Sequence, residues 1–198
     1  MIPFFNYTIH VDLPQCLPEK QMIINTLNPH SFCVARKDNL FSESLQASDI
    51  LIPDGVGIVW GVKQLHGIQT RKIAGYDLHI HCLDLLEKQN GGKIFYLGAS
   101  ENTLKKIKQR ITKEYPNVEV GYYSPPFKAE FSTEDNDTIL KQINAFKPDI
   151  LCVGMTAPKQ EKWVHQFKNK LDVNIICSIG AVFDFYAGTV KRPSEFWI

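Results

Sequence analysis

The sequence predicts an α/β fold in which a mostly parallel sheet carries helices on both faces. Short apolar, β-branched runs alternate with helical patterns of about 10–15 residues, the order typical of βαβ units. The runs ILCV (150–153) and IICSI (175–179) are apolar almost throughout. Such runs are typical of strands that are covered on both faces of a sheet. Most of the runs end in a glycine-bearing turn directly before a helix.

The predicted strands are apolar runs bounded by Asn, Asp, Gly or Pro. They cover, in order, residues 21–27, 49–52, 93–97, 117–122, 149–153 and 173–179. The predicted helices begin at a capping residue or a helix breaker, as at Asn28-Pro29, Ser100 and Pro158. They cover 29–46 with a break at Asp38, a stretch through Val62, then 76–89, 101–115, 133–146 and a helix that has Pro158 as its first residue. Together these elements indicate a Rossmann-like fold.

The carboxyl ends of parallel strands share one edge of a sheet, and ligands bind at that edge in open α/β sheets. The turns expected there are 26–28, 53–57, 98–100, 154–158 and 180–184. Because they precede helix N-termini, these turns suit a ligand that carries phosphate. The sequence therefore predicts a cleft lined by these turns.

Length and charge narrow the class of protein. The chain has 198 residues, which fits a single domain covering 1–198. Lys and Arg number 22 and Asp and Glu 21, so a net charge of +1 gives no global field to hold nucleic acid. No stretch approaches the roughly 18 apolar residues of a membrane span, and the N-terminus lacks a secretory pattern. We expect a cytoplasmic protein with no nucleic-acid partner.

The five cysteines predict neither a disulfide framework nor a zinc site. Their number is odd and no two stand at C-x-x-C spacing. Cys152 and Cys177 lie inside apolar runs, where a buried, reduced thiol is the ordinary interpretation.

A glycine-rich turn, Asp54-Gly55-Val56-Gly57 through Gly61, follows the second predicted strand. Its place between a strand and a helix is that of a dinucleotide-binding loop, so a nicotinamide site is one interpretation. The glycine spacing departs from that motif, however, and an aspartate beside a pyrophosphate would oppose its charge. Glycines that serve only a tight turn are a second interpretation. We favour a third, in which Asp54 is a general base beside an anionic ligand.

Two further segments place polar residues near predicted helix starts. Arg71 and Lys72 suit the neutralisation of a diphosphate. A solvated loop with Asp77 as the partner of a helix dipole explains the same residues more simply. Gln160 follows Pro158 in a first helical turn and faces the predicted cleft edge. The aromatic residues of 180–188 are interpreted as core.

Two patterns that suggest a metal are discounted. Asp135-Asn136-Asp137 has D-x-D form but belongs to an acidic helix start, not to a buried strand end. His79 and His81 stand two apart on a predicted helix and point to opposite sides, so they cannot share one ion. We predict no metal site.

Taken in order, these motifs resemble the WecG/TagA/CpsF family of bacterial glycosyltransferases. The resemblance runs from about Thr26 to Pro193, and it is specific through the order and spacing of the motifs. The motifs are Thr26-Leu27-Asn28-Pro29-His30-Ser31, Pro53 to Gly57, Arg71 with Gly75 and Asp77, Tyr96-Leu97-Gly98, Ala157 to Glu161 with Trp163, and Gly180 to Asp184 through Lys191-Arg192-Pro193.

The resemblance implies a hexosyltransferase that moves an N-acetylmannosamine-type sugar from a UDP donor to an undecaprenyl-diphosphate-linked GlcNAc. It implies inversion at the anomeric carbon, no metal and no cofactor, in the synthesis of teichoic acid, common antigen or capsule. Asp54 then looks like the catalytic base, and Gly98 and the 154–158 turn look like nucleotide contacts. The binding residues implied in all are Thr26, Asn28, Gly55, Arg71, Gly75, Asp77, Gly98, Gly154, Pro158, Gln160, Glu161, Lys191 and Arg192.

The resemblance also concerns partners and location. Members of the family self-associate and continue past the Lys-Arg-Pro motif into a basic, aromatic tail that engages the membrane. We therefore expect a homo-oligomer that acts at the inner face of the cell membrane, and a chain that lacks this tail. Two alternatives stay open. One is a nicotinamide-dependent oxidoreductase, and the other is a non-catalytic nucleotide-binding module.

Overall fold

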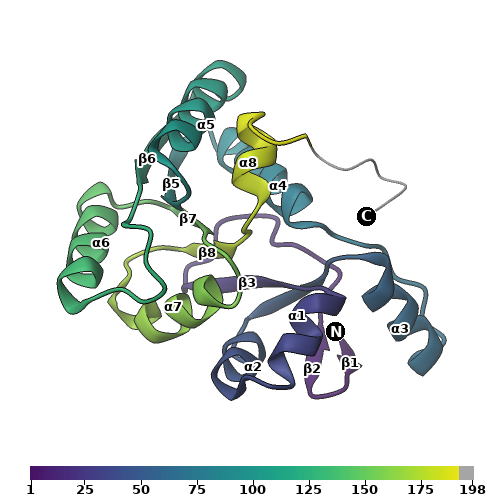
Figure 1. The fold of residues 1–198 in the computed structure, drawn as a ribbon. Helices are drawn as coiled ribbons and strands as arrows, with labels where there is room; N and C mark the ends of the chain where they lie inside the picture. Colours follow the sequence, from purple (N-terminus) through teal and green to yellow (C-terminus); the bar gives the residue numbers. More distant parts are fainter. Residues whose placement is uncertain (192–198) are drawn as a thin grey trace.

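Six parallel strands form a central sheet between two layers of helices within residues 1–191, the part of the chain that the computed structural model describes (Figure 1). The strand order is β4-β3-β8-β7-β5-β6, and every neighbouring pair is parallel. The strands are β3 (Met22–Leu27), β4 (Ile50–Pro53), β5 (Gly92–Gly98), β6 (Val118–Tyr123), β7 (Ile150–Gly154) and β8 (Ile175–Ser178). This arrangement confirms the predicted fold class.

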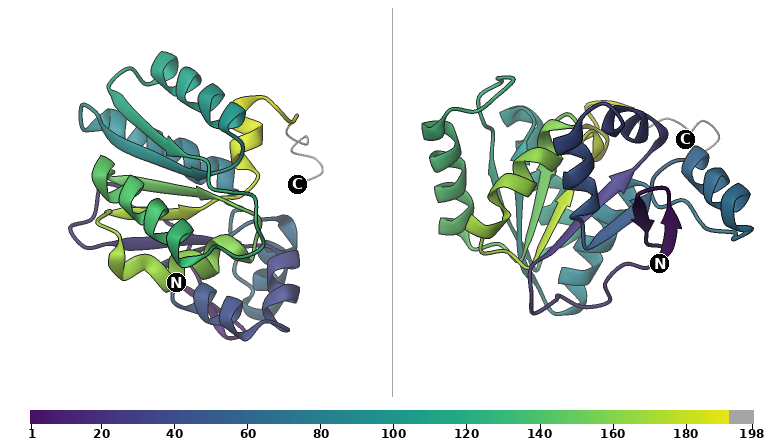
Figure 2. Two further views of the ribbon diagram at one scale, coloured as in Figure 1. Left: turned by 60° about the vertical axis from the view of Figure 1, so that its left-hand side comes forward. Right: turned by 90° about the horizontal axis from the view of Figure 1, so that it is seen from below.

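Each face of the sheet is covered by its own set of helices (Figures 1 and 2). In β5 the consecutive residues Ile94, Phe95, Tyr96 and Leu97 are all buried, two on each face, which explains why its sequence is apolar throughout. One face packs against α4 (Gly75–Lys88), α5 (Glu101–Glu114) and α8 (Val182–Ala187). The other packs against α1 (Pro29–Ala35), α2 (Asn39–Gln46), α6 (Thr133–Phe146) and α7 (Lys159–Phe167), which the 3₁₀ turn η1 (Lys168–Lys170) follows.

The predicted element starts agree with the caps that the structure shows. Asn28, Asp38, Ser100 and Ser132 each accept a backbone N–H from the first turn of α1, α2, α5 and α6, respectively. The expected break at Asp38 is therefore the boundary between two helices. Pro158 corrects one expectation, because it is the N-cap of α7 and not its first helical residue.

Three features of the fold are missing from the sequence prediction. Residues 1–20 contain a small antiparallel hairpin of β1 (Ile2–Phe4) and β2 (Tyr7–Ile9). The chain after β2 lies along edge strand β4, where the backbone N–H of His10 donates to Leu51 O at 2.8 Å. Beside this hairpin lies α3 (Val56–His66), which extends past the predicted end at Val62. The sequence predicts no helix over the six residues of α8, since they span too few turns to give a clear period.

The connections create two switch points at the carboxyl edge of the sheet. The helices that follow β5 and β8 cover one face, whereas those that follow β3, β6 and β7 cover the other. Strand β8 therefore differs from both of its neighbours, β3 and β7, and β7 differs from β5. A crevice opens where the chains leave neighbouring strands in opposite directions. The fold thus predicts one crevice around the end of β8 and another between the ends of β7 and β5. Among the described residues, no helix has both the length and the apolar character needed to cross a bilayer.

Candidate functional site

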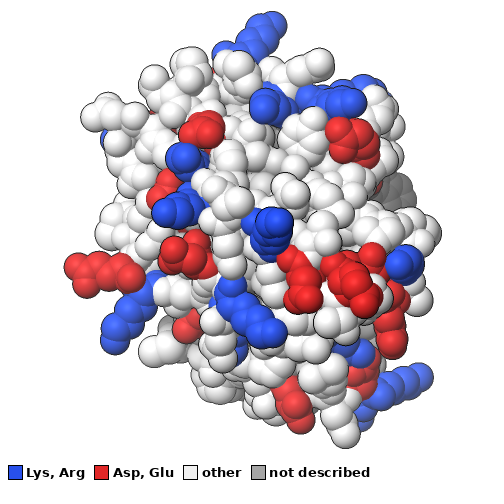
Figure 3. All heavy atoms as spheres, turned by 90° about the vertical axis from the view of Figure 1, so that its left-hand side faces the viewer, with Lys and Arg blue, Asp and Glu red and all other residues white. Residues whose placement is uncertain are grey.

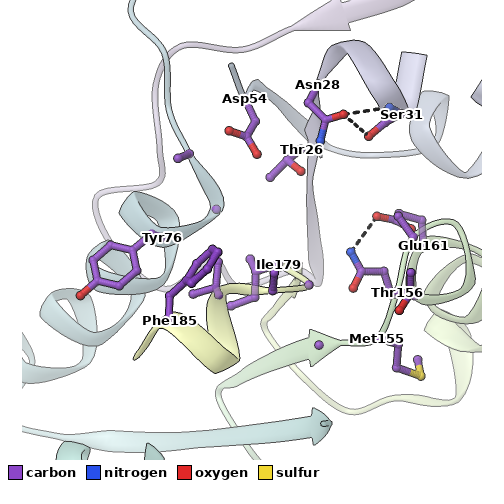
Figure 4. A pocket seen from close by; sticks show the side chains of 18 residues that line it. Thr26, Asn28, Ser31, Asp54, Tyr76, Met155, Thr156, Glu161, Ile179 and Phe185 are labelled. Atoms are coloured by element: carbon purple, nitrogen blue, oxygen red, sulfur yellow. Dashed lines mark hydrogen bonds between the residues drawn. The ribbon is translucent and has the colours of Figure 1, made fainter. Parts of the chain in front are cut away.

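A cleft of about 390 Å³ lies at the first of these switch points, at the ends of β3, β4, β7 and β8. Figure 4 shows its side chains entering from both helical layers. Its walls are formed by Thr26, Asn28, Ser31, Asp54, Ala74, Gly75, Tyr76, Gly154, Met155, Thr156, Ala157, Gln160, Glu161, Ile179, Gly180, Ala181, Val182 and Phe185. The predicted meeting of the strand-end turns is confirmed for four of the five turns at this one cleft.

Asp54 is held in this cleft by the pairing of two neighbouring strands. In the parallel register Leu27 stands opposite Pro53, and the backbone N–H of Asp54 donates to Leu27 O at 2.8 Å. Asp54 therefore lies beside Leu27 at the end of β3, although these two residues are far apart in the sequence. Figure 4 shows the side chains of Asp54, Thr26 and Asn28 next to one another at one end of the cleft.

Asn28 is both the cap of α1 and a wall residue. Its Oδ1 accepts the backbone N–H of Ser31 at 2.8 Å and the Ser31 hydroxyl at 2.9 Å. Because this oxygen caps the helix, the amide nitrogen is the atom that Asn28 can offer to a ligand. The helix start thereby fixes the direction of a hydrogen-bond donor in the cleft.

The N-terminal turns of α1, α4 and α7 all contribute to the walls. They supply residues 28–31, 74–76 and 157–161. The first N–H groups of a helix have no acceptor within the helix, and its aligned peptide dipoles make that end positive. Three such ends at one cleft favour an anionic group there, as the phosphate-suited turns predicted.

A buried amide and carboxyl face each other on the α7 side of the cleft. Gln160 is 4% exposed and Glu161 3% exposed. The Gln160 Nε2 donates to Glu161 Oε1 at 2.8 Å, the contact drawn in Figure 4. Within the described residues, no hydrogen-bond partner reaches Gln160 Oε1 or Glu161 Oε2. Burial raises the pKa of the Glu161 carboxyl, and the hydrogen bond from Gln160 opposes that rise.

This pair fixes which atom of Gln160 a ligand can reach. An ionised carboxylate only accepts hydrogen bonds, so it holds the NH₂ group of Gln160. The amide oxygen of Gln160 then remains as a buried acceptor in the wall. Buried polar atoms in native proteins almost always have a partner. The arrangement therefore favours a ligand that brings a hydroxyl or N–H donor to this wall.

A second, larger cleft of about 980 Å³ lies at the other switch point, between the ends of β5 and β7. It shares residues 154–157 with the first cleft, so the two are adjacent along one wall. Lys159 lines this cleft, with Nζ 3.5 Å from the centroid of the Phe131 ring. Its walls are formed by Gly98, Ala99, Ser100, Glu101, Ser124, Pro125, Pro126, Phe127, Lys128, Ala129, Phe131, Gly154, Met155, Thr156, Ala157, Pro158, Lys159, Phe183 and Asp184.

Most of the predicted site residues lie in these two clefts. Thr26, Asn28, Asp54, Gly75, Gly154, Gln160 and Glu161 line the first, and Gly98, Gly154 and Pro158 line the second. Gly98 and Gly154 face each other across the β5–β7 pair, where a Cβ on Gly98 would lie 2.5 Å from Gly154 O. This close approach explains the glycine at position 98, whereas position 154 is glycine because a Cβ there would lie 2.5 Å from the Phe183 ring.

Four predicted residues lie outside both walls: Gly55, Arg71, Asp77 and Lys191. Arg71 and Lys191 are exposed to solvent. The carboxylate of Asp77 accepts the backbone N–H of Ala74 at 2.9 Å, which agrees with the simpler interpretation of that residue as part of a helix start. Arg192, the remaining predicted residue, lies outside the described residues.

The glycines of the 54–61 turn serve packing. A Cβ on Gly57 would lie 2.7 Å from the Pro29 ring, and one on Gly61 would lie 2.9 Å from the Phe4 ring. Of this turn, only Asp54 lines the first cleft. The glycines therefore shape the chain, and the aspartate faces the cleft.

Sequence reasoning missed part of the walls, including Ser31, Tyr76 and Phe185. The sequence prediction assigns all aromatic residues of α8 to the core. Phe183 and Tyr186 are buried, although Phe183 also borders the second cleft, whereas Phe185 lines the first cleft. Positions 183 and 186 are three apart and share a helix face, whereas 185 points elsewhere. Helical period would have separated Phe185 from the other two, had the helix been recognised.

The residues discounted as metal ligands have other roles. Asp135 accepts hydrogen bonds from the Ser132 backbone and from Lys128 at the start of α6. His79 is fully buried, and its Nε2 lies 2.6 Å from the Tyr96 hydroxyl. Within residues 1–191, no three His, Cys, Asp or Glu side chains gather in a way that could hold a metal ion.

Comparison with known proteins places this site in a family. The model of the Glycosyl transferase WecG/TagA/CpsF family matches residues 8–198. A protein of Bacillus subtilis (strain 168), named N-acetylglucosaminyldiphosphoundecaprenol N-acetyl-beta-D-mannosaminyltransferase, is 30% identical over 176 residues, 89% of this chain and 66% of the relative. Proteins of the same name from Bacillus spizizenii (strain ATCC 23059 / NRRL B-14472 / W23) and Staphylococcus aureus (strain NCTC 8325 / PS 47) are 26% and 28% identical.

Each match covers a larger share of this chain than of the relative. The match to the Bacillus spizizenii protein covers 98% of this chain and 73% of the relative, and the match to the Staphylococcus aureus protein covers 86% and 65%. The chain thus spans about two thirds of the length of these relatives. Because the family model covers nearly the whole sequence and its motifs form the clefts described above, this chain belongs to the WecG/TagA/CpsF family of glycosyltransferases.

Proposed function

We propose that this protein transfers an N-acetylmannosamine-type sugar from UDP to the GlcNAc of an undecaprenyl-diphosphate-linked acceptor. The sugar and the acceptor are those in the names of its relatives. The UDP donor, inversion at the anomeric carbon and independence of metal are further parts of the proposal. With a lipid-linked acceptor, the protein would act as a peripheral enzyme at the inner face of the cell membrane.

One observation carries the proposal: the Asp54 side chain lines a cleft that also receives the N-terminal turns of three helices. Transfer from a nucleotide sugar needs a base for the acceptor hydroxyl and positive charge for the departing diphosphate. The carboxylate supplies the first, and the helix ends supply the second. The exposed Arg71 and Lys191 lie outside the walls, so within residues 1–191 the helix ends are the main support for an anion here.

The proposed reaction is a single displacement. As the acceptor oxygen forms its bond to the anomeric carbon, its proton passes to the Asp54 carboxylate. The bond from that carbon to the β-phosphate oxygen breaks, and its electron pair leaves with UDP. Attack from the side opposite the leaving group inverts the anomeric centre. Backbone N–H groups at the starts of α1, α4 and α7 stabilise the growing charge on the diphosphate.

The two adjacent clefts suit a donor with two parts. We assign the sugar and diphosphate to the first cleft and the nucleoside to the second, beside Gly98 and Pro158. The shared wall of residues 154–157 would lie along the diphosphate. The unpaired amide oxygen of Gln160 would accept a hydrogen bond from a sugar hydroxyl or from the acetamido N–H.

The Asp54→Asn variant tests the catalytic assignment. It keeps the size of the side chain but removes the base, so turnover should fall by about 10²–10⁴-fold while UDP binding persists. Transfer is measured with a panel of UDP sugars and a lipid-diphosphate GlcNAc acceptor, and the anomeric configuration of the product is read by NMR. Asp137→Asn, at an exposed carboxylate in α6, is the matched control and should behave as the parent. Asp54→Asn turnover near the parent rate would reject Asp54 as the base.

Ligand binding separates this proposal from the two alternatives. A ligand that binds only the folded state raises its melting temperature. We expect UDP to stabilise the protein and NAD(H) to leave it unchanged; stabilisation by NAD(H) alone would favour an oxidoreductase. Binding of UDP sugars without transfer to any acceptor would favour a nucleotide-binding module.

A further inference from the structure

One segment of the chain is basic and apolar without any acidic residue. Between Asp54 and Asp77 the sequence contains Lys63, His66, Arg71 and Lys72 but neither Asp nor Glu. This contrasts with the chain as a whole, where 22 basic residues are balanced by 21 acidic ones. It also contrasts with the face shown in Figure 3, where Lys and Arg alternate with Asp and Glu.

The apolar side chains of this segment are exposed. Helix α3 buries Ile58 and Val62 against the core of the hairpin and edge strand, while Val56 and Trp60 are each 65% exposed. Leu65 and, in the loop after the helix, Ile68 are also exposed. Val56 and Trp60 are four residues apart and Lys63 follows three later, so the three share one helix face. We call Val56, Trp60 and Ile68, with Lys63, Arg71 and Lys72, the α3 surface.

A helix that is apolar on two faces usually has a neighbour on both. The inner face of α3 has one in the hairpin, where Gly61 lies against the Phe4 ring. The outer face has no neighbour among the described residues, and Figures 1 and 2 show α3 projecting from the body of the molecule.

The α3 surface is tied to the first cleft at both of its ends. The segment leaves the cleft wall at Asp54 and returns to it at Ala74–Tyr76. Just before it returns, the backbone N–H of Ile73 donates to Pro53 O at 2.9 Å. This hydrogen bond joins the two ends of the segment that contains α3. Whatever the α3 surface contacts is therefore held close to the opening beside Asp54.

We propose that the α3 surface binds an anionic lipid bilayer. Trp prefers the headgroup region, aliphatic side chains enter the boundary of the acyl chains, and Lys and Arg are attracted to anionic lipids. The α3 surface combines all three, and its lack of acidic residues leaves no repulsion from such lipids. The proposal rests on the proposed function, because an undecaprenyl-linked acceptor brings its diphosphate to the membrane surface. Docking through α3 would hold the cleft at the level of the membrane surface where this diphosphate lies.

Vesicle co-sedimentation of the whole chain tests this surface without any substrate. The protein should bind vesicles rich in phosphatidylglycerol, bind phosphatidylcholine vesicles weakly, and lose most of its binding in high salt. Trp60→Glu places a negative charge at the centre of the surface and should lower partitioning at least tenfold. Leu40→Glu is the matched control, since Leu40 is 49% exposed on α2, away from this surface, and should bind as the parent. An unchanged circular dichroism spectrum and UDP affinity show that Trp60→Glu is folded.

Three results would overturn the proposal. The protein could fail to bind anionic vesicles, or Trp60→Glu could bind them as well as the parent does. Alternatively, analytical ultracentrifugation could show a dimer that Trp60→Glu abolishes, without vesicle binding, which would make the surface an interface between two copies.

The activity assay separates this proposal from the proposed function. With a water-soluble, short-chain acceptor, Trp60→Glu and the parent should turn over equally. With the acceptor embedded in vesicles, the variant should lose at least tenfold in rate. Vesicle binding together with no turnover on either acceptor would refute the proposed function and leave the α3 surface standing.

Discussion

Replacing the buried carboxyl of Glu161 by an amide should stabilise the protein at neutral pH and yet weaken its activity. In the parent, Glu161 is 3% exposed and only Oε1 has a hydrogen-bond partner among the described residues. A buried polar group without a partner costs about 1–3 kcal/mol, and a charged one costs more than an amide. The variant Glu161→Gln removes the charge at nearly constant volume.

The pH dependence gives this prediction its sign. Burial raises the pKa of Glu161 in the folded protein above its ordinary value of 4.5. The folded state therefore holds this proton more tightly than the unfolded state does. The contribution of the Glu161 carboxyl to the free energy of unfolding is greatest below its ordinary, unfolded-state pKa. It falls as pH rises through the pKa of the folded state, and it is constant above that pKa. Glu161→Gln does not titrate, so its advantage should be absent at acid pH and complete at neutral pH.

The expected gain at pH 7 is about 1 kcal/mol, because the hydrogen bond from Gln160 already offsets part of the desolvation cost. For a domain of this size that corresponds to a rise in melting temperature of about 2–4 °C. Urea denaturation at a series of pH values measures it. The exposed Glu43→Gln is the control and should change stability by less than about 0.5 kcal/mol at every pH.

Activity should change in the opposite direction. The carboxylate accepts hydrogen bonds only, whereas an amide at position 161 both donates and accepts. The side-chain amide of Gln160 can therefore flip, exchanging its oxygen and nitrogen. Loss of one fixed hydrogen bond to the ligand costs about 0.5–1.5 kcal/mol, or roughly two- to tenfold in KM, with a smaller effect on kcat. The reasoning is refuted if Glu161→Gln is less stable than the parent at pH 7, or if the stability difference is the same at pH 4 and pH 7.

Two other predictions concern the shared wall of the clefts and the reaction. Gly154→Ala would place its Cβ 2.5 Å from Phe183 Cδ2, so we expect a loss of about 1–3 kcal/mol in stability and weaker UDP binding. Because the clash is with the Phe183 ring, the double variant Gly154→Ala/Phe183→Leu should be less destabilised than the sum of its single variants, and strict additivity in thermal denaturation would contradict that cause. Turnover should persist in EDTA, since the helix ends are proposed to stabilise the diphosphate. Activity that EDTA abolishes and magnesium restores would require a metal in the mechanism.

Local sequence patterns were sufficient for the elements that position the site. Apolar runs marked each strand of the sheet, and Asn28 and Ser100 marked helix starts at which the structure shows capping hydrogen bonds. These signals are local, because a cap acts within one turn and a buried strand shows its burial in consecutive residues. Asp54 could be placed at a strand end for the same reason.

Long-range packing decided what the patterns could not. The strand order β4-β3-β8-β7-β5-β6 brings Thr26, Asp54 and Gln160 to one cleft, and periodicity within a strand contains no information about its neighbours. The same packing leaves Arg71 in solvent and places Phe185 in the wall of the first cleft, whereas Phe183 is buried beside the second.

Glu161 shows most clearly the difference between what local sequence predicts and what tertiary packing decides. By sequence it is an acid in the first turn of a helix, where the dipole favours a negative charge near solvent. In the tertiary structure the same carboxyl is buried in the wall of the first cleft, and burial raises its pKa. The sequence by itself determined the parallel sheet, its edge and the aspartate beside it, because these follow from local preferences. The tertiary structure decided which side chains share the cleft and which apolar face of α3 stays exposed, because burial depends on segments that are distant in the chain.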